Sequence, residues 1–305
     1  MAGDEVHGLV RRSSSINTAR LDGVYQDPHE DNRRLHLHYG DVLDQASLIR
    51  ILQAVQPDEV YHLAAQSHVR VSFDEPVYSA DVAGLGTARL LEAIRLLGLH
   101  PRIYVAGSSE VFGDAAAPQN EDTPFRPRSP YAAAKAYAIH IARVYRESYG
   151  MRIVVGILFN HASERRGETF VSRKITRAVA RIAAGKQQHL YLGNLDARRD
   201  WGYAPEYTAA MVQMLRVATP TDYVLGTGES HSVAEFVEHA FAAVDLDWRA
   251  YVRHDARYLR PAEVPELRAD ARRAVAAIGW APFVRFPNLV KRMGLGDLRE
   301  AEAGR

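Results

Sequence analysis

The sequence contains no cysteine, no long apolar run and no excess of charge of either sign. The absence of cysteine excludes disulfides and thiolate chemistry. No apolar stretch approaches the ~18 residues of a membrane span, and Asp4 and Glu5 stand where a signal peptide would be basic and then apolar. The 38 Lys and Arg residues balance 37 Asp and Glu, so no global field attracts nucleic acid or an anionic membrane. We therefore predict a cytoplasmic protein with neither as a partner.

The remaining composition is that of an ordinary globular protein, with 305 residues, 47% of them hydrophobic and 25% charged. Short apolar runs alternate with helical patterns through the first half of the chain. This alternation is typical of βαβ units, and it predicts an α/β fold with a doubly wound, parallel Rossmann-like sheet. The expected strands are 6–10, 35–39, 59–63, 103–106 and 153–158, and the expected helices are 45–55, 83–97 and 170–184.

The character of the sequence changes after Phe159, where residues 160–169 are polar and carry arginine and glycine. We predict a nucleotide-binding domain over residues 1–160. A smaller, mixed α/β domain over residues 161–305 would bind the substrate and interleave with the first domain. Doubly wound sheets bind ligands outside the carboxyl ends of their strands, so candidate residues are sought directly after each strand.

Tyr131 and Lys135 form a Tyr-x-x-x-Lys motif. On a helix this spacing places the phenol and the ammonium on one face. A nearby cation stabilises phenolate, so the tyrosine can act as acid and base near neutral pH. An exposed helix pair is the alternative reading of the motif alone. Ser129 and Pro130, however, provide a helix start directly before Tyr131.

Ser108 and Glu110 follow the expected strand 103–106. This is where a serine can hydrogen-bond the same substrate oxygen as the tyrosine, because both would lie at the carboxyl edge of the sheet.

A further group of residues suits a dinucleotide. The first expected strand ends at Arg11 and Arg12, where an NAD enzyme usually has an acidic residue for the ribose hydroxyls. Arginine instead favours the 2′-phosphate of NADP, although an exposed arginine pair is the alternative. Asp41 and Val42 follow the second strand and would flank the adenine. Mostly small residues follow the third strand, where backbone must approach the cofactor: Leu63, Ala64, Ala65, Gln66 and Ser67.

The serine, tyrosine and lysine resemble the catalytic set of the extended short-chain dehydrogenase/reductase family, whose members act on nucleotide sugars. Four longer segments are similar to the GDP-mannose 4,6-dehydratases of that family, and the similarity continues to about Trp280. These segments are residues 11–18 (RRSSSINT), 160–171 (NHASERRGETFV), 192–202 (LGNLDARRDWG) and 260–264 (RPAEV).

The resemblance implies dehydration of GDP-mannose through a transient 4-ketone, with NADP as cofactor. Tyr131 would take the proton from the 4-hydroxyl, Ser108 would hold that oxygen, and Lys135 would serve both the tyrosine and the cofactor. Glu110 would remove the C5 proton before water leaves from C6. This glutamate would separate a dehydratase from a simple epimerase, although decarboxylases of the family can also carry one.

The resemblance also adds ligand contacts. Tyr78, His161 and Arg166 would complete the NADP site. Arginine and lysine side chains would neutralise the diphosphate of the sugar nucleotide, and a glutamate would accept from ribose hydroxyls or guanine nitrogens. A homodimer or homotetramer is implied, in which residues 11–18 reach a neighbouring cofactor site. The implied substrate residues are Asn160, Thr169, Val171, Lys174, Asn194, Arg199, Arg260 and Glu263.

The sequence departs from the family pattern at its start. Dinucleotide-binding folds begin with a strand, a glycine-rich turn and a helix, whereas residues 3–10 match the second strand of the family. A first βα unit of roughly 20 to 25 residues is thus expected to be absent, judged from the ~30 residues of a βαβ unit. We attribute this to a misplaced start or a truncation; if the chain is genuine as it stands, weak NADP binding follows. Two neighbouring strands would then lack partners.

Three functions stay open from the sequence. The leading one is an NADP-dependent GDP-mannose 4,6-dehydratase. Another nucleotide-sugar epimerase, reductase or decarboxylase is opposed by the RRSSS and LGNLD segments. An inactive sugar-nucleotide-binding homologue is opposed by the joint presence of the catalytic residues.

Two histidines raise the question of a metal. His36 and His38 alternate on an expected strand and point to one face, but the sequence places no third ligand beside them. No metal site is therefore predicted.

Overall fold

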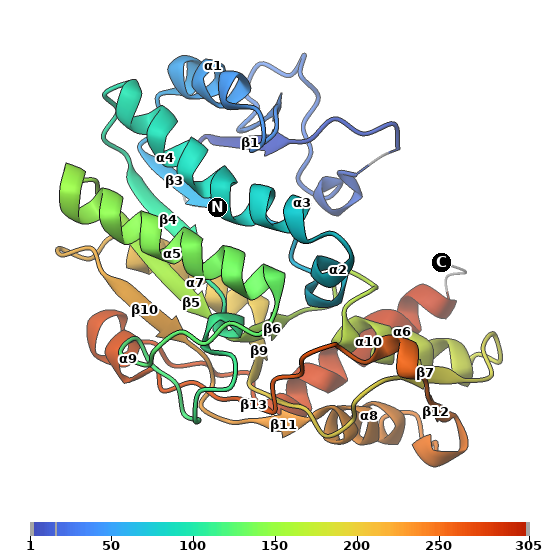
Figure 1. Ribbon diagram of the computed structural model, residues 1–305. Coiled ribbons are helices and arrows are strands. Elements are labelled where there is room, and N and C mark those ends of the chain that lie inside the picture. Colours follow the sequence, from blue (N-terminus) through green and yellow to red (C-terminus); the bar gives the residue numbers. More distant parts are fainter. Residues whose placement is uncertain (1–2, 16, 303–305) are drawn as a thin grey trace.

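The computed structural model describes residues 3–15 and 17–302 (Figure 1). Ile16 of the segment 11–18, and residues 1–2 and 303–305 at the ends of the two predicted domains, lie outside it. Within the described part, no helix combines the length and apolarity needed to cross a lipid bilayer. The strands are β1 (Val6–Val10), β2 (Leu35–Tyr39), β3 (Glu59–His62), β4 (Arg102–Ala106), β5 (Ile153–Leu158), β6 (Asn160–Ala162), β7 (Leu190–Leu192), β8 (Arg198–Arg199), β9 (Trp201–Tyr203), β10 (Asp222–Leu225), β11 (His231–Ser232), β12 (Val252–His254) and β13 (Glu266–Leu267).

Helices alternate with the strands through the first half of the chain. The α-helices are α1 (Gln45–Val55), α2 (Val69–Asp74), α3 (Pro76–Ala80), α4 (Gly86–Leu96), α5 (Pro130–Tyr149), α6 (Val171–Ala183), α7 (Ala204–Met214), α8 (Val233–Ala242), α9 (Arg272–Ile278) and α10 (Phe286–Glu302). Shorter helical turns are η1 (Ala19–Leu21), the π-helical η2 (Asp81–Leu85), η3 (Ser109–Phe112), η4 (Trp248–Ala250) and η5 (Ala256–Tyr258).

A four-stranded parallel sheet, in the order β10-β5-β4-β3, forms the centre of the molecule. Successive residues of its strands enter different cores. Ile103 and Val105 of β4 pack with α4 and α5, whereas Tyr104 between them packs with α7 and Trp280. Every residue of β5 is buried. A central strand covered on both faces is typical of doubly wound α/β folds, which confirms the predicted fold class.

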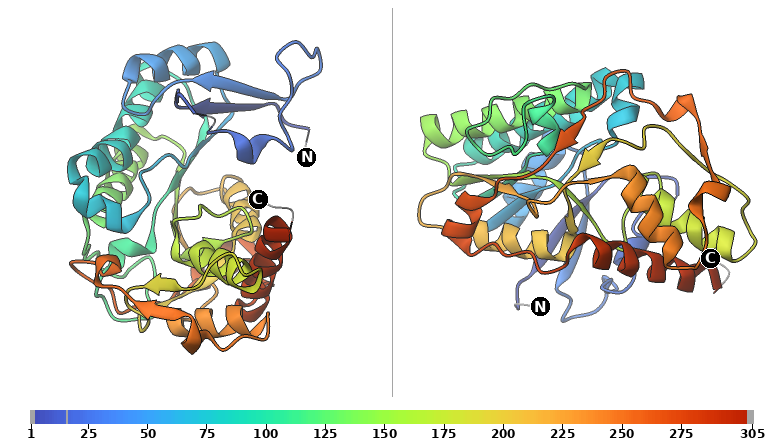
Figure 2. Two further views of the ribbon diagram at one scale, coloured as in Figure 1. Left: turned by 90° about the vertical axis from the view of Figure 1, so that its right-hand side faces the viewer. Right: turned by 90° about the horizontal axis from the view of Figure 1, so that it is seen from below.

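The strands β1 and β2 form a separate two-stranded parallel ladder. Among the described residues no ladder joins β1 to β3, so each has an unpaired edge (Figures 1 and 2). This confirms the predicted break. An unpaired backbone group costs about 1–3 kcal/mol when it is buried, and three of the five residues of β1 are exposed.

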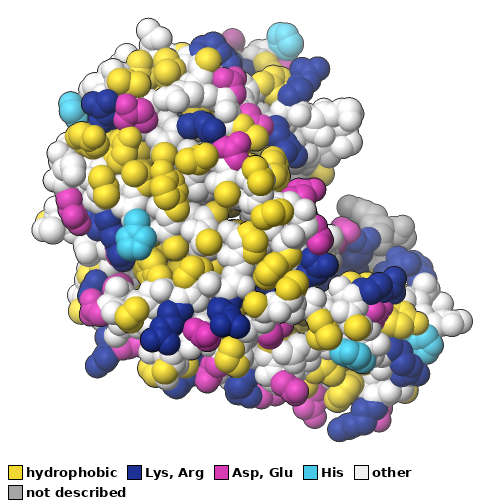
Figure 3. Space-filling model, in the orientation of Figure 1, with side chains coloured by type: hydrophobic (Ala, Val, Ile, Leu, Met, Phe, Trp, Pro, Cys, Tyr) yellow, Lys and Arg dark blue, Asp and Glu magenta, His cyan; other side chains and the backbone are white. Residues whose placement is uncertain are grey.

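A second core forms from the C-terminal half, where α6, α8 and α10 surround Trp201, Phe236 and Phe286. The strand β10 leaves this region and pairs with β5, so sequence beyond residue 160 enters the parallel sheet. The space-filling view is hollowed between the N-terminal half and the C-terminal lobe (Figure 3). The pairing of Leu225 with Leu158 brings residues of the C-terminal half to the carboxyl edge of the sheet. The domain division at residue 160 stays a prediction.

The predicted helix 83–97 differs most from the structure among the predicted elements. In the structure this segment begins with the π-helical η2 at Asp81 and continues as α4 from Gly86. Gly86 lies so close to Val42 that an added Cβ would stand 3.1 Å from a Val42 methyl group. Hydrophobic periodicity gives no signal for this close approach of the helix to the loop after β2. It also gave none for the short helices α2 and α3.

Candidate active site

Helix α5 positions the tyrosine and lysine of the predicted motif. Its N-cap is Ser129, whose hydroxyl accepts a hydrogen bond from the backbone N–H of Ala132, and Pro130 occupies the first turn. Tyr131 and Lys135 are 7% and 3% exposed. The Lys135 Nζ donates a hydrogen bond to the backbone oxygen of Ala106, at the carboxyl end of β4, over 2.8 Å. The two side chains therefore face the sheet edge, not solvent.

Burial controls the proton affinities of this pair. It raises the pKa of Tyr131 to about 12, and the Glu110 carboxylate adds to this rise. A hydrogen bond to Ser108 and the charge of Arg166 act in the opposite direction. Burial lowers the pKa of Lys135 to about 8. Arg166 is thus a cation near the phenol that the Tyr-x-x-x-Lys motif alone did not indicate.

Ser108 and Glu110 lie in the turn between β4 and η3. The Ser108 hydroxyl accepts from the backbone N–H of Glu110 and begins η3. Gly113 ends this turn with a φ of +54°, and an added Cβ would stand 1.7 Å from the backbone oxygen of Arg126. Only glycine fits there, so Gly113 allows the close backbone turn that directly follows η3 and its residue Glu110. Glu110 is 7% exposed.

Two arginines from the C-terminal half reach the Glu110 carboxylate. Arg260 Nη1 lies 3.3 Å from Glu110 Oε1, and Arg199 Nε lies 3.9 Å from the same oxygen. Arg199 is 5% exposed, and it also donates to Glu263 over 3.1 Å and to the backbone oxygen of Val264 over 2.8 Å. The burial of Arg199 lowers its pKa. Cations from β8 and the segment 260–264 thus meet a catalytic candidate from η3, the turn that follows β4.

A hollow opens beside these arginines. Its lining includes three predicted substrate residues, Asn194, Arg260 and Glu263, together with Asp196 and His254. The last two were not predicted from the sequence. Asp196 lies within the segment 192–202, which could have nominated it, whereas His254 ends the short strand β12 outside every quoted segment.

Other predicted substrate residues lie at the entrance to α6 or nearby. Asn160 pairs with Trp201 through β6 and β9, and Val171 is the first residue of α6. The backbone oxygen of Thr169 lies 3.4 Å from His68 Nε2. Lys174 is engaged within the protein, because its Nζ donates to the backbone oxygen of Tyr191 and lies 3.3 Å from the centre of the Tyr258 ring.

His161 and Arg166 lie together near Tyr131. His161 is stacked on Tyr207, and its Nδ1 lies 2.8 Å from the backbone oxygen of Phe159. Burial lowers the pKa of His161 to about 4, so the ring is neutral at pH 7. Arg166 donates to the backbone oxygen of His161 and stacks on the Phe170 ring. The structure thus brings these two predicted cofactor residues together, with Arg166 near the candidate tyrosine Tyr131.

We expect the free energy of unfolding to fall as the pH is lowered from about 6.5 to about 4. Burial lowers the pKa of His62 to about 3 and that of His161 to about 4, so the unfolded chain binds protons that the folded chain excludes. Each such group contributes about 1.4 kcal/mol per pH unit. Urea unfolding at several pH values measures the slope. His161→Gln should flatten it, His29→Gln on the surface should not, and an unchanged slope in His161→Gln would contradict this origin.

The N-terminal cofactor candidates gather at the carboxyl ends of β1, β2 and β3. Arg11 Nη1 donates to the Tyr78 hydroxyl over 2.7 Å, and the Arg12 guanidinium lies over the Tyr39 ring. Asp41 accepts from the backbone N–H of Leu43 and so shapes the turn after β2. Val42 is buried, whereas Leu63 and Ser67 are exposed, and Ala64 and Ala65 are half-buried.

These residues fit part of an NADP molecule. The exposed arginines after β1 supply the cationic donors that a 2′-phosphate needs. Gln66 Oε1 is buried and has no hydrogen-bond partner among the described residues, so it can accept from a ribose hydroxyl or an amide. Within residues 3–15 and 17–302, however, no glycine-rich turn follows a strand at the place of the dinucleotide diphosphate.

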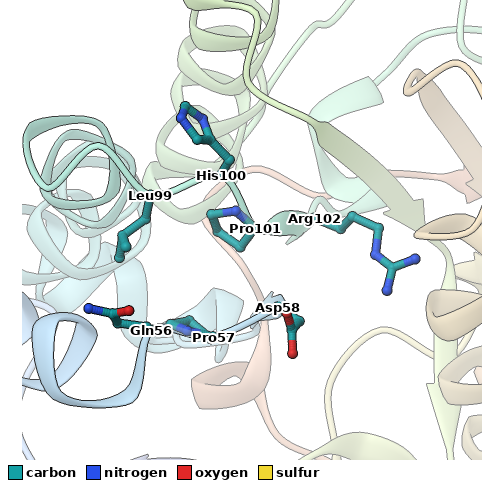
Figure 4. A pocket seen from close by; sticks show the side chains of 7 residues that line it. All are labelled: Gln56, Pro57, Asp58, Leu99, His100, Pro101 and Arg102. Carbon is teal, nitrogen blue, oxygen red and sulfur yellow. The ribbon is translucent and has the colours of Figure 1, made fainter.

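A second hollow lies at the opposite end of the sheet (Figure 4). It is lined by the loops before β3 and β4, residues 56–58 and 99–102. Because it faces the amino ends of these strands, it is remote from the catalytic candidates. It also contains none of the predicted site residues.

A parallel α/β sheet with serine, tyrosine and lysine at its carboxyl edge is the arrangement of an extended short-chain dehydrogenase/reductase. Within that class, the chain belongs to the GDP-mannose 4,6-dehydratase family, whose model matches residues 1–293. It is 53% identical over 305 residues to GDP-mannose 4,6 dehydratase 1 of Arabidopsis thaliana, which covers 98% of this chain and 84% of that protein.

Solved structures agree with this assignment. DesIV, a dTDP-glucose 4,6-dehydratase from Streptomyces venezuelae with NAD and TYD bound, superposes with a TM-score of 0.86 at 26% identity, over 99% of this chain and 89% of that one. RMD from Pseudomonas aeruginosa, complexed with NADPH, gives a TM-score of 0.77 at 26% identity over 88% and 90% of the two chains.

Proposed function

We propose that this chain is an NADP-dependent dehydratase that converts GDP-D-mannose to GDP-4-dehydro-6-deoxy-D-mannose. One observation carries the proposal: a buried carboxylate, Glu110, lies beside the Ser108 and Tyr131 side chains. The serine and tyrosine are sufficient to oxidise an alcohol. A third group that can accept a proton adds the ability to eliminate water.

The first half of the reaction is the oxidation of C4. A bound NADP, held by the residues after β1, β2 and β3 and by His161 and Arg166, would supply the hydride acceptor for C4 and the hydride donor for C6. Tyr131 takes the proton of the 4-hydroxyl as that oxygen becomes a ketone, and Ser108 donates a hydrogen bond that holds the oxygen. Lys135 supplies positive charge at the carboxyl end of β4, where its ammonium is anchored to Ala106. Because burial raises the pKa of Tyr131, the cations near it favour the proton transfer.

The second half is the loss of water. The 4-ketone makes the C5 proton acidic, and the Glu110 carboxylate accepts it. Two protons have then been taken from the sugar, one by Tyr131 and one by Glu110. One returns with the 6-hydroxyl as it leaves as water, and one returns to C5, so the enzyme is restored.

Substrate binding and the ion pairing of the Glu110 carboxylate are linked through two arginines. Arg260 and Arg199 are the cations nearest to Glu110, and we assign the diphosphate of the sugar nucleotide to the same pair. A bound diphosphate therefore competes with the carboxylate for the guanidinium donors. Glu110 is released to act as a base when the substrate is in place. Asn194 and Glu263 line the adjacent hollow and suit the nucleoside.

Arg11→Ala is expected to raise the Kd for NADP⁺ about tenfold to a hundredfold and to leave the Kd for NAD⁺ little changed. Hydrogen bonds to charged groups contribute ~1.5–3 kcal/mol, and 1.4 kcal/mol is about tenfold in affinity. Titration calorimetry with both dinucleotides measures the effect. Arg34→Ala, at the other end of the same ladder, serves as the matched control. Equal losses for NAD⁺ and NADP⁺ would contradict a 2′-phosphate contact.

We further propose that the chain acts in the cytoplasm as a homodimer or homotetramer. Residues 11–15 are exposed, and Arg20 donates to the backbone oxygen of Arg165 close to the site. This arrangement leaves the arginine-rich loop on the surface, where a second copy can contact it. Light scattering with size-exclusion chromatography tests the oligomeric state.

The direct test of the activity uses the 305-residue chain with GDP-mannose and NADP⁺. Mass spectrometry should find a product that is lighter by one water. Other nucleoside diphosphate sugars, such as dTDP-glucose and UDP-glucose, should give no comparable product. Binding of GDP-mannose without product would instead support a binding protein, and a product of unchanged mass would support an epimerase.

A further inference from the structure

Three histidines and a glutamate meet on the β1–β2 ladder, away from the proposed reaction. The parallel register places His7 directly opposite His36, and His38 stands two residues further along β2 on the same face. Glu5 precedes β1, and its Oε1 lies 3.1 Å from His7 Nε2 and 3.0 Å from His36 Nε2. The predicted pair of β2 histidines thus acquires partners from the neighbouring strand.

We propose that this cluster is a zinc-class metal site held by Glu5 Oε1, His7 Nε2 and His36 Nε2. These three atoms lie within 4.8 Å of one another. In a tetrahedral site with metal–ligand distances of ~2.0–2.2 Å, two ligand atoms stand roughly 3.3 Å apart. The two measured separations from Glu5 are close to that spacing. Two imidazoles and one carboxylate leave a fourth position for water or another ligand, and this donor set is one that Zn²⁺ accepts.

A hydrogen bond to His38 can select the tautomer of His7 that a metal site needs. The Nδ1 of His7 lies 2.9 Å from the Nε2 of His38. When Nδ1 of His7 donates the proton to His38, Nε2 of His7 carries only its lone pair and is free for a metal. Such an outer partner is common behind metal-bound histidines.

The cluster is accessible to an ion. The side chains of His7, His36 and Glu5 are 25%, 19% and 61% exposed. The His7 and His36 rings are stacked with centres 4.7 Å apart and an angle of 12° between their planes. A metal must lie in the plane of each ring it binds, so at least one ring has to turn about its Cβ–Cγ bond. Partial exposure leaves room for that rotation.

The test is titration of the full, tag-free chain with Zn²⁺ by calorimetry, with Co²⁺ as a spectroscopic probe. One ion per chain is expected, and bound Co²⁺ should show the intense visible bands of four-coordination. His7→Gln and His36→Gln should each abolish the saturable binding. His38→Gln should weaken it about 10- to 100-fold. His100→Gln, in an exposed loop, is the matched control and should bind one ion normally.

Two results would overturn the proposal. One is the absence of saturable Zn²⁺ binding by the wild-type chain. The other is binding that persists in a His7→Gln, His36→Gln double variant whose circular dichroism matches that of the wild type, because the ion would then lie elsewhere. Neither result bears on the dehydratase activity, which is measured separately with GDP-mannose.

Discussion

Replacing Glu110 by glutamine is expected to lower kcat for water loss by ~10²–10⁴, the usual contribution of a general base, with little change in KM for GDP-mannose. Glutamine has nearly the same shape, and its amide oxygen can still accept a hydrogen bond from Arg260. It cannot take the C5 proton. The loss should therefore appear in the chemical step and not in binding. Mass spectrometric rates over a range of substrate concentrations separate the two constants.

Solvent isotope incorporation sharpens this test. In deuterium oxide the wild-type enzyme should place one deuterium at C5 of the product, whereas Glu110→Gln should leave the C5 proton of unreacted substrate unexchanged. Glu147→Gln, at an exposed position of α5, is the matched control and should behave as the wild type. Unchanged dehydration by Glu110→Gln would remove this residue from the mechanism.

Tyr131→Phe is expected to lower kcat by a similar ~10²–10⁴, but through the earlier step. The phenol is the group that accepts the 4-hydroxyl proton, and phenylalanine keeps the ring and its packing without that oxygen. Oxidation at C4 should then fail, so neither C5 exchange nor product is expected. This pattern distinguishes the variant from Glu110→Gln, in which C4 chemistry remains possible.

The control for Tyr131→Phe lies on the same helix. Tyr137 is 42% exposed, and Tyr137→Phe should leave kcat and KM near the wild-type values. Unfolding by urea should show that both variants remain folded. A Tyr131→Phe enzyme with nearly full activity would mean that another group accepts the 4-hydroxyl proton.

Local patterns were sufficient for most of the sheet. The predicted strands 6–10, 35–39 and 153–158 and helix 45–55 have the bounds found in the structure, because each is an apolar run or a clear helical repeat with polar ends. Residues that share one element were also predictable, and the spacing of Tyr131 and Lys135 on α5 is an example. Periodicity carries no signal for β6 and β9, which are three residues each.

Contacts between distant segments could not be derived from patterns. Glu110 and Arg260 are 150 residues apart in the sequence, and only resemblance to a family nominated both. His7 and His36 offered no such resemblance. Their contact depends on the register of β1 against β2, and a shift of one residue would turn the histidines of one strand to the opposite face.

The β1–β2 ladder and the central sheet are separate sheets among the described residues, and we expect them to differ in local stability. The small ladder can open without breaking any hydrogen bond of the four-stranded sheet, so its amide hydrogens should exchange with solvent far faster than those of β4 and β5. The residues proposed for the 2′-phosphate and adenine of NADP directly follow the strands of the ladder, whereas Lys135 lies on α5 and is anchored to the central sheet. A bound dinucleotide would therefore contact both the ladder and the residues beside the central sheet. Its free energy of binding would stabilise the ladder, so the amide hydrogens of β1 and β2 should exchange more slowly with solvent.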